Sequence, residues 1–348
     1  MDAAELPLWQ NIGIFIGAGV LILIVGTWLA GLADRFADRT GMGEAMTGTV
    51  FLGLVTSLPG LTTSITAAID GRPSLAISNA LGGIAVQTAF LGLADISYSR
   101  ANLEHAVASV QNMMQIVLLA ILLSMVLLAF SSPELTVAHV HPVSPAILLV
   151  AGFGIFIIYR SGKEPMWQPS HTRETVADVA DENNEQENLP LLALKLAVAS
   201  LAVILAGVVV ARTTGNIVDQ TGMSEVVAGA LLSGVVTSLP ELVTSIAAVR
   251  RGALTLAVAD ITGGNFFDVL FLFAVDVAYL SGSAFHSPGI GAREVFMTAL
   301  ILLLNMILLL GLIVRQRSGP GNIGLESVLV LTLYLGGASA LAFTDFAG

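Results

Sequence analysis

Residues 56–60 are Thr-Ser-Leu-Pro-Gly, and residues 237–241 are Thr-Ser-Leu-Pro-Glu, 181 positions further along the chain. Both stretches lie inside long apolar runs, and the same offset aligns residues 38–96 with residues 219–277 without a gap. Identical Thr, Ser, Pro, Gly and Asp residues at one fixed offset cannot come from shared apolar composition alone. The pattern therefore indicates an internal duplication.

The composition places this duplicated chain in a membrane. Of its 348 residues, 55% are hydrophobic and 11% are charged, whereas roughly 25% are charged in a soluble domain. Runs of about 20 apolar residues are long enough to cross a hydrocarbon core roughly 30 Å thick. We therefore exclude a soluble enzyme, a nucleic-acid-binding protein and a secreted scaffold. The chain has no cysteine, so it has no disulfide framework and no thiolate metal site.

Ten membrane-spanning helices are expected, in two halves of five. The predicted spans are residues 11–33, 46–69, 73–96, 112–130, 144–159, 190–211, 227–249, 253–280, 294–314 and 323–343. Residues 1–160 form the first half and residues 190–348 the second, joined by an acidic linker at 161–189. Equivalent points are separated by five spans, an odd number, so the second half is inverted. The sequence predicts an all-α integral membrane protein made of two inverted five-helix repeats.

Lysine and arginine set the expected orientation, because they accumulate in cytoplasmic loops. With the N-terminus outside, eleven of the 14 Lys and Arg residues fall on the cytoplasmic side. Only Arg72, Arg212 and Arg293 fall on the other side. We expect a plasma-membrane protein with both termini extracytoplasmic and with residues 161–189 in the cytoplasm.

Proline interrupts two of the predicted spans. Pro59 and Pro240 each remove a backbone hydrogen bond and press on the preceding turn, so the second and seventh helices should be kinked or broken. Inverted repeats with interrupted helices are typical of secondary transporters, which bind their substrates near the bilayer midplane. The duplication could instead be a packing scaffold, but its shared residues are polar rather than small and apolar.

Polar side chains gather at the second break and on the span that follows. Thr237 and Glu241 share one helix face by their spacing, as do Asp260 and Asp268 on the eighth span. A charged group at the centre of a lone span costs about 2.5–3.5 kcal/mol on insertion scales. No arginine lies in mid-span to pair with these acids, so we favour cation coordination for Glu241 and Asp268. Asp260 is nearer the start of its span, where an interfacial position is equally consistent with the sequence.

These residues resemble a known pattern. Thr-Ser-Leu-Pro-Glu in a kinked helix, followed by Gly-Asn-x-x-Gly-Ser-Asn-x-x-Asn/Asp in the next, occurs twice in the calcium:cation antiporter superfamily, which includes the Na⁺/Ca²⁺ exchangers. The resemblance covers both repeats and implies that their oxygen atoms together bind the transported cations, with no cofactor. The metal ligands that it implies are Thr56, Ser57, Gln87, Thr237, Ser238, Glu241 and Asp268.

The first repeat departs from the family pattern at three positions. Gly60 replaces the usual glutamate, Gly83 replaces a serine, and Gln87 stands at the final amide or acid. Glu241 and Asp268 are then the only acids expected at the midplane by this mapping. Fewer fixed charges should weaken the binding of a divalent cation relative to the standard family site, and protons should compete with the metal.

Three functions are consistent with these features. The leading hypothesis is a secondary antiporter that works by alternating access and exchanges Ca²⁺ or another divalent cation against Na⁺ or H⁺. The second is Na⁺/H⁺ exchange, which the glycine at position 60 makes plausible. The third is a non-transporting membrane scaffold or sensor derived from the exchanger fold. An enzyme is disfavoured because the spans contain no Ser/His, Cys/His or His-rich metal arrangement. The expected partners are inorganic cations and the lipid bilayer.

Overall fold

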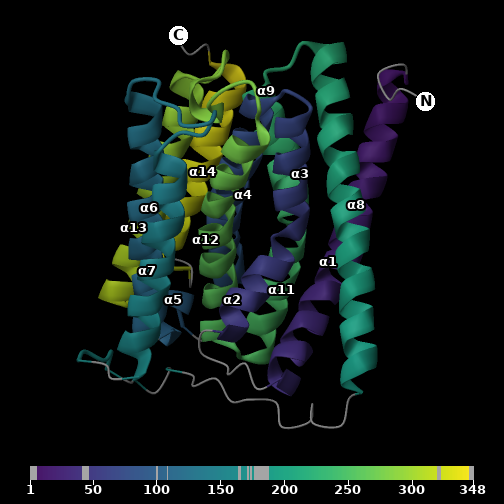
Figure 1. Ribbon diagram of the computed structural model, residues 1–348. Coiled ribbons are helices and arrows are strands. Elements are labelled where there is room, and N and C mark those ends of the chain that lie inside the picture. Colours follow the sequence, from purple (N-terminus) through teal and green to yellow (C-terminus); the bar gives the residue numbers. More distant parts are fainter. Residues whose placement is uncertain are drawn as a thin grey trace.

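The computed structural model describes residues 6–40, 47–98, 101–107, 109–163, 166–170, 172, 175, 188–319 and 323–344. Within these ranges the named secondary-structure elements are all helices, and they form one elongated bundle (Figure 1). The expectations for residues 41–46, for Arg100 and Arg173, and for most of the acidic linker lie outside the described residues.

Eight of the described helices are long and apolar enough to cross a membrane. They are α1 (Leu8–Thr40), α4 (Pro73–Ile96), α6 (Val110–Ser131), α7 (Val143–Lys163), α8 (Leu189–Thr221), α12 (Leu254–Ala278), α13 (Ala292–Val314) and α14 (Leu325–Phe343). Two short helices lie in the connections, α5 (Leu103–Ala106) and the 3₁₀ helix η4 (Ala284–His286).

The remaining helices are broken where the sequence contains proline. In the first half, α2 (Thr47–Thr56) is followed by α3 (Leu58–Ile69), which has Pro59 in its first turn. In the second half, α9 (Glu225–Val227), the π-helical η3 (Ala228–Ser233) and α10 (Gly234–Thr237) lead into α11 (Leu239–Arg251). The bend between α10 and α11 is 44°. The predicted breaks in the second and seventh helices are therefore confirmed.

The number of spans differs slightly from the expected ten. Over the described residues, length and composition give nine spans when the bent pair that ends in α11 is taken as one. The tenth expected span corresponds to α2 and α3, which have 10 and 12 residues and are each too short to cross a membrane alone.

Helix boundaries repeat with the offset found in the sequence. α1 and α8 each have 33 residues and begin 181 positions apart, at Leu8 and Leu189. α4 and α12 begin with the same offset, at Pro73 and Leu254. α1 and α8 pack together but run in opposite directions, α1 descending and α8 rising in Figure 1. The all-α inverted architecture is thus confirmed.

Helices α4 and α12 occupy the centre of the bundle. The most apolar window of α4 is 100% buried and that of α12 is 78% buried, against 22–44% for the other spanning helices. Polar residues on these two helices are therefore shielded from lipid. Gly82 of α4 lies so close to the backbone of Ala230 in η3 that a Cβ atom would collide with it.

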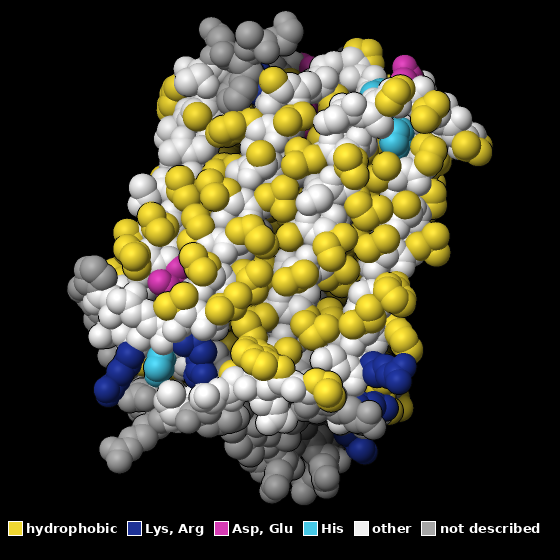
Figure 2. Space-filling view, turned by 90° about the vertical axis from the view of Figure 1, so that its left-hand side faces the viewer, with side chains coloured by type: hydrophobic (Ala, Val, Ile, Leu, Met, Phe, Trp, Pro, Cys, Tyr) yellow, Lys and Arg dark blue, Asp and Glu magenta, His cyan; other side chains and the backbone are white. Residues whose placement is uncertain are grey.

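The surface has the pattern expected of a membrane protein. Figure 2 shows hydrophobic side chains spread over the middle of one face, with Lys and Arg gathered near its lower end. The lower end is where α7 ends and α8 begins (Figure 1). We call it the linker end of the bundle.

Candidate cation site

Both proline breaks meet α4 and α12 at a small internal cavity. Its volume is about 10 Å³, close to the space that a single water molecule needs. Its lining residues are Ser57, Gly60, Asn79, Ala80, Gly83, Gln87, Thr237, Ser238, Glu241, Asp268 and Phe271. Six of the seven predicted ligands line this cavity, and the side chain of the seventh, Thr56, interacts with Glu241.

Gln87 joins the two repeats across this cavity. Its Nε2 donates a hydrogen bond to Asp268 Oδ2 over 2.9 Å, and its distance to Ser238 Oγ is 3.1 Å. Gln87 comes from α4 in the first repeat, whereas both acceptors belong to the second. The amide oxygen of Gln87 makes no hydrogen bond with a described residue and lies beside Gly264 of α12.

Several oxygen atoms at the cavity are buried without a partner. Among the described residues, no hydrogen bond of good geometry reaches either carboxylate oxygen of Glu241, Ser57 Oγ, Gln87 Oε1 or Asn79 Oδ1. The Thr56 hydroxyl is nevertheless close enough to interact with Glu241, and the Ser57 hydroxyl with Asp268. The Glu241 side chain is 0% exposed. A buried carboxylate without a partner is costly, and carboxylate, hydroxyl and amide oxygens are the ligands that hard cations prefer.

Acids alone do not make this site. In the described parts of the chain, no group of three or more Asp, Glu, His or Cys side chains is arranged to hold a metal ion. A cation at the cavity would therefore depend on the hydroxyl and amide oxygens as well as on Glu241 and Asp268. That metal-binding role remains a prediction.

The two threonines of the repeated motif are tied to their own helices. Thr237 Oγ1 donates to the carbonyl oxygen of Ser233 over 2.9 Å, and Thr56 Oγ1 lies 3.2 Å from the carbonyl oxygen of Gly53. Both side chains are buried. Thr237 lines the cavity, whereas Thr56 is not among its lining residues.

Two glycines make room for the contact between Gln87 and Asp268. A Cβ atom on Gly83 would come within 3.0 Å of Asp268 Oδ2, and one on Gly264 within 2.8 Å of Gln87 Oε1. Serine at either position would crowd these longer side chains. Gly60 differs, because a Cβ atom there would make ordinary contacts, 3.7 Å from Thr237 Oγ1.

Asn79 lines the cavity but is not among the ligands predicted from the sequence. Its Nδ2 lies 3.1 Å from the carbonyl oxygen of Gly60 and 2.9 Å from Ser64 Oγ, so this amide satisfies backbone exposed near the first break. A signal was available, since Asn79 aligns with Asp260 at the offset of the repeat. In that pair only Asp260 carries a charge, and a charge within a span is what marks a residue as a candidate ligand.

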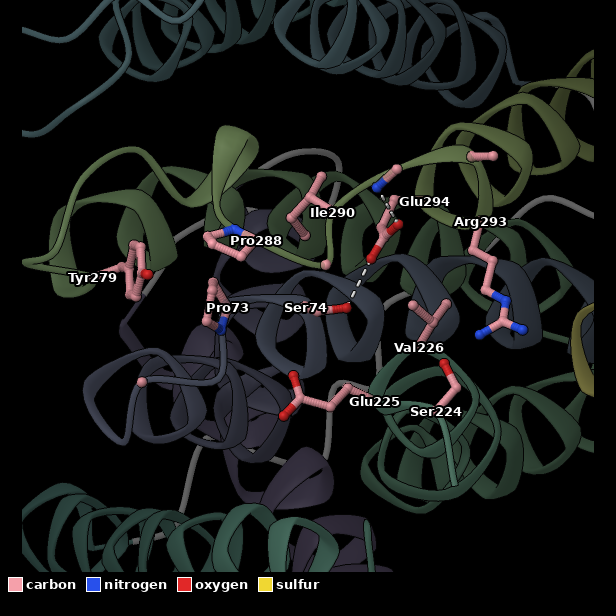
Figure 3. Close-up of a pocket in the computed structure, with 14 residues that line it drawn as sticks. Pro73, Ser74, Ser224, Glu225, Val226, Tyr279, Pro288, Ile290, Arg293 and Glu294 are labelled. Atoms are coloured by element: carbon pink, nitrogen blue, oxygen red, sulfur yellow. Dashed lines mark hydrogen bonds between the residues drawn. The ribbon is translucent and has the colours of Figure 1, made fainter. Parts of the chain in front are cut away.

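A larger pocket, about 710 Å³ in volume, opens where α4, α9 and α13 begin (Figure 3). Its acids are already engaged. Glu294 accepts hydrogen bonds from Ser74 Oγ over 2.8 Å and from the Gly291 N–H over 2.9 Å. Glu225 forms an ion pair with Arg72 over 2.9 Å. These contacts link and cap helices, so we place the candidate cation site at the central cavity.

The sequence of the chain is similar to those of known membrane proteins. Residues 10–162 and 191–341 match the family model of sodium/calcium exchanger proteins. The chain is 27% identical over 321 residues to CaxA, a candidate antiporter of Alkalimonas amylolytica, covering 89% of this chain and 94% of CaxA. It is 25% identical over 268 residues to the inner membrane protein YrbG of Escherichia coli K12, covering 76% and 78%.

Solved structures show the same fold. The sodium-calcium exchanger NCX_Mj superposes with a TM-score of 0.60 at 18% identity, covering 98% of this chain and 100% of that one. The H⁺/Ca²⁺ exchanger CAX superposes with a TM-score of 0.69 at 11% identity, covering 96% and 82%. With its two repeats matched by the family model, the chain belongs to the sodium/calcium exchanger protein family.

Proposed function

We propose that the protein is a secondary active antiporter that exchanges Ca²⁺ or another divalent cation against Na⁺ or H⁺. The observation that carries the proposal is the Glu241 carboxylate, fully buried and without a hydrogen-bond partner among the described residues, at a cavity shared with Asp268. Membership of the exchanger family supports it, as does the fold shared with a sodium-calcium exchanger and an H⁺/Ca²⁺ exchanger.

Charge neutralisation explains how exchange would work at this site. Glu241 and Asp268 carry two formal negative charges, which one divalent cation or two monovalent cations or protons would neutralise. A cavity near the size of one water molecule has little room for a hydration shell, so the side-chain oxygens must replace the water that a cation loses. The same oxygens would serve either ion, and this competition couples the two fluxes.

We expect cations to reach this site alternately from the two sides of the plasma membrane. We assign the linker end to the cytoplasm, because Lys and Arg gather there (Figure 2). The start of α1 and the end of α14, which lie at the opposite end in Figure 1, would then face outward.

Flux through reconstituted liposomes tests the proposal. Outwardly directed Na⁺ or H⁺ gradients should each be tried as the driving force for Ca²⁺ uptake, with wild type, Glu241→Gln and the exposed-site control Glu134→Gln. Wild type and Glu134→Gln should take up Ca²⁺ at similar rates. Glu241→Gln should lose at least tenfold, because it removes a charged ligand.

Two results would replace this proposal. Na⁺/H⁺ exchange without Ca²⁺ uptake would identify a monovalent cation antiporter, as glycine at position 60 allows. An absence of all cation flux, together with thermal stability that no cation changes in wild type or Glu241→Gln, would favour a non-transporting scaffold or sensor.

A further inference from the structure

Asp260 is a buried acid that the central cavity does not include. It lies in the second turn of α12 and is only 3% exposed, so its side chain is enclosed by the protein. Its Oδ2 accepts a hydrogen bond from Thr244 Oγ1 over 2.7 Å. Its Oδ1 is buried and makes no hydrogen bond with any described residue.

Asn79, the counterpart of Asp260 in the first repeat, shows which hydrogen bonds an aspartate at this position cannot donate. The Asn79 amide donates to groups on α3, the Gly60 carbonyl and Ser64 Oγ. An aspartate carboxylate has no hydrogen to donate. Correspondingly, Ser245, which aligns with Ser64, has a buried hydroxyl without a partner in the described chain, and Glu241, which aligns with Gly60, has two such oxygens.

Helix spacing relates Glu241 and Ser245, and a hydrogen bond links the same helix to Asp260. Glu241 and Ser245 are four residues apart and share one face of α11. Thr244, the hydrogen-bond partner of Asp260, lies about 4.5 Å from Glu241 along the helix axis, toward the linker end. The charge of Asp260 acts directly on Glu241.

Two other acids interact with Asp260 through their charges. The charge of Asp260 acts on Glu241 of α11, and the charge of Asp34 of α1 acts on Asp260. Asp260 forms no ion pair with a described Lys or Arg. An acid in these surroundings needs a cation or a proton to offset its charge.

We propose that Asp260, Glu241 and Ser245 form a second cation position, on the linker side of the central cavity. This inference rests on the proposed antiport function and extends it. The carboxylate of Asp260 replaces, from the other repeat, the charge that Gly60 does not supply. Together with Asp268, the three acids carry a formal charge of −3, which one divalent and one monovalent cation would neutralise. Oxygen ligands suit Na⁺ and Ca²⁺ at the two positions.

The variant Asp260→Asn tests this inference, because it removes the charge with little change of volume. Asparagine is also the residue at the equivalent position 79 of the first repeat. Na⁺ and Ca²⁺ binding to the purified full chain should be measured by calorimetry, with the exposed acid Glu134, changed in Glu134→Gln, as the control for loss of a negative charge elsewhere in the chain. Asp260→Asn should bind one cation fewer per chain and should weaken Na⁺ binding about tenfold or more. Glu134→Gln should change either affinity less than twofold.

A second variant distinguishes the loss of a cation position from a folding defect. Gly60→Glu in the Asp260→Asn background returns a carboxylate near Thr237, where a Cβ atom fits. It should bind Ca²⁺ with an affinity within a fewfold of wild type, which shows that the central site is folded, while the Na⁺ position at Asp260 stays lost.

Unchanged stoichiometry and affinity in Asp260→Asn would overturn the second position. If Glu241→Gln still abolished flux in the same preparation, the proposed antiport function would stand alone. If Glu241→Gln had no effect either, both proposals would fall.

Discussion

Glu104 is a buried carboxyl group outside the membrane-spanning helices. It lies in α5, is 2% exposed, and its Oε1 accepts a hydrogen bond from Ser327 Oγ over 3.0 Å. Its Oε2 has no hydrogen-bond partner among the described residues. Burial, with a further contribution from the nearby charge of Asp95, raises the pKa of Glu104 to about 8. The group is therefore mostly protonated at neutral pH.

This protonation makes stability depend on pH. Because the pKa of Glu104 is 4.5 in a model compound and about 8 in the fold, the folded chain holds a proton that the unfolded chain releases between these values. Stability should fall as pH rises from 4.5 to about 8 and then level off, by up to about 1.4 kcal/mol per pH unit. Thermal unfolding of Glu104→Gln between pH 5 and pH 9 should lack this slope, while Glu134→Gln should keep it. Parallel curves for wild type and Glu104→Gln would contradict the assignment.

Most residues of the candidate site could be predicted because the repeat aligns polar groups. Ser57 and Ser238 both line the cavity, as two copies of one motif should. The hydrogen bond from Gln87 to Asp268 could not be predicted, because it depends on how closely two helices from different repeats approach. The burial of Asp260 could not be decided from the sequence for a similar reason, since hydropathy does not show how closely α11 packs against the start of α12.

At the scale of elements, a close approach of α4 and η3 holds the two repeats together. A Cβ atom on Gly82 would come 2.4 Å from Ala230 Cα, and one on Gly229 would come 2.7 Å from the carbonyl oxygen of Leu75. Such distances leave space for hydrogen only. A larger side chain at either glycine would therefore require the backbones of the two helices to move apart.

This close packing predicts unequal effects for two glycine substitutions on neighbouring helices. Gly82→Ala should destabilise the protein by about 1–3 kcal/mol, the usual cost of overpacking. Gly60→Ala should be neutral or stabilising by up to about 1 kcal/mol, because its Cβ atom would lie 3.6 Å from the nearest side chain and alanine favours helix. Thermal unfolding in detergent measures both. Equal losses in the two variants would show that the contact with η3 is not what Gly82 protects.

Helix ends were harder to predict than helix positions. The sequence predicts a first span at 11–33, but α1 continues to Thr40 through a charged segment. Hydropathy marks where lipid ends, whereas a helix can continue into water. The π-helical turn of η3 was also unforeseen, because local sequence does not specify the insertion of one residue into a helical turn.

For the whole molecule, the inverted architecture follows from the duplication together with an odd number of spans between equivalent points. The sequence contains both facts, so the fold class could be predicted without a structure. The two repeats are nevertheless unequal in charge. Glu241, Asp260 and Asp268 all belong to the second repeat, whereas the aligned residues Gly60, Asn79 and Gln87 are neutral. Because these central acids all belong to one repeat, the ligands exposed to the two sides of the membrane need not be equivalent. We therefore expect the ion affinity to differ between the two sides of the membrane.

The orientation of the whole molecule can be tested directly, because the chain has no native cysteine. Val137, in the connection between α6 and α7, is 74% exposed, and Trp167, just beyond α7, is 58% exposed. A membrane-impermeant maleimide added to intact cells should label Val137→Cys, whereas Trp167→Cys should react only after permeabilisation. Leu149→Cys, which faces outward from mid-α7, should react slowly in both cases because a thiol ionises poorly in hydrocarbon. Labelling of Trp167→Cys from outside would reverse the orientation, and with it the side from which the Asp260 position is reached.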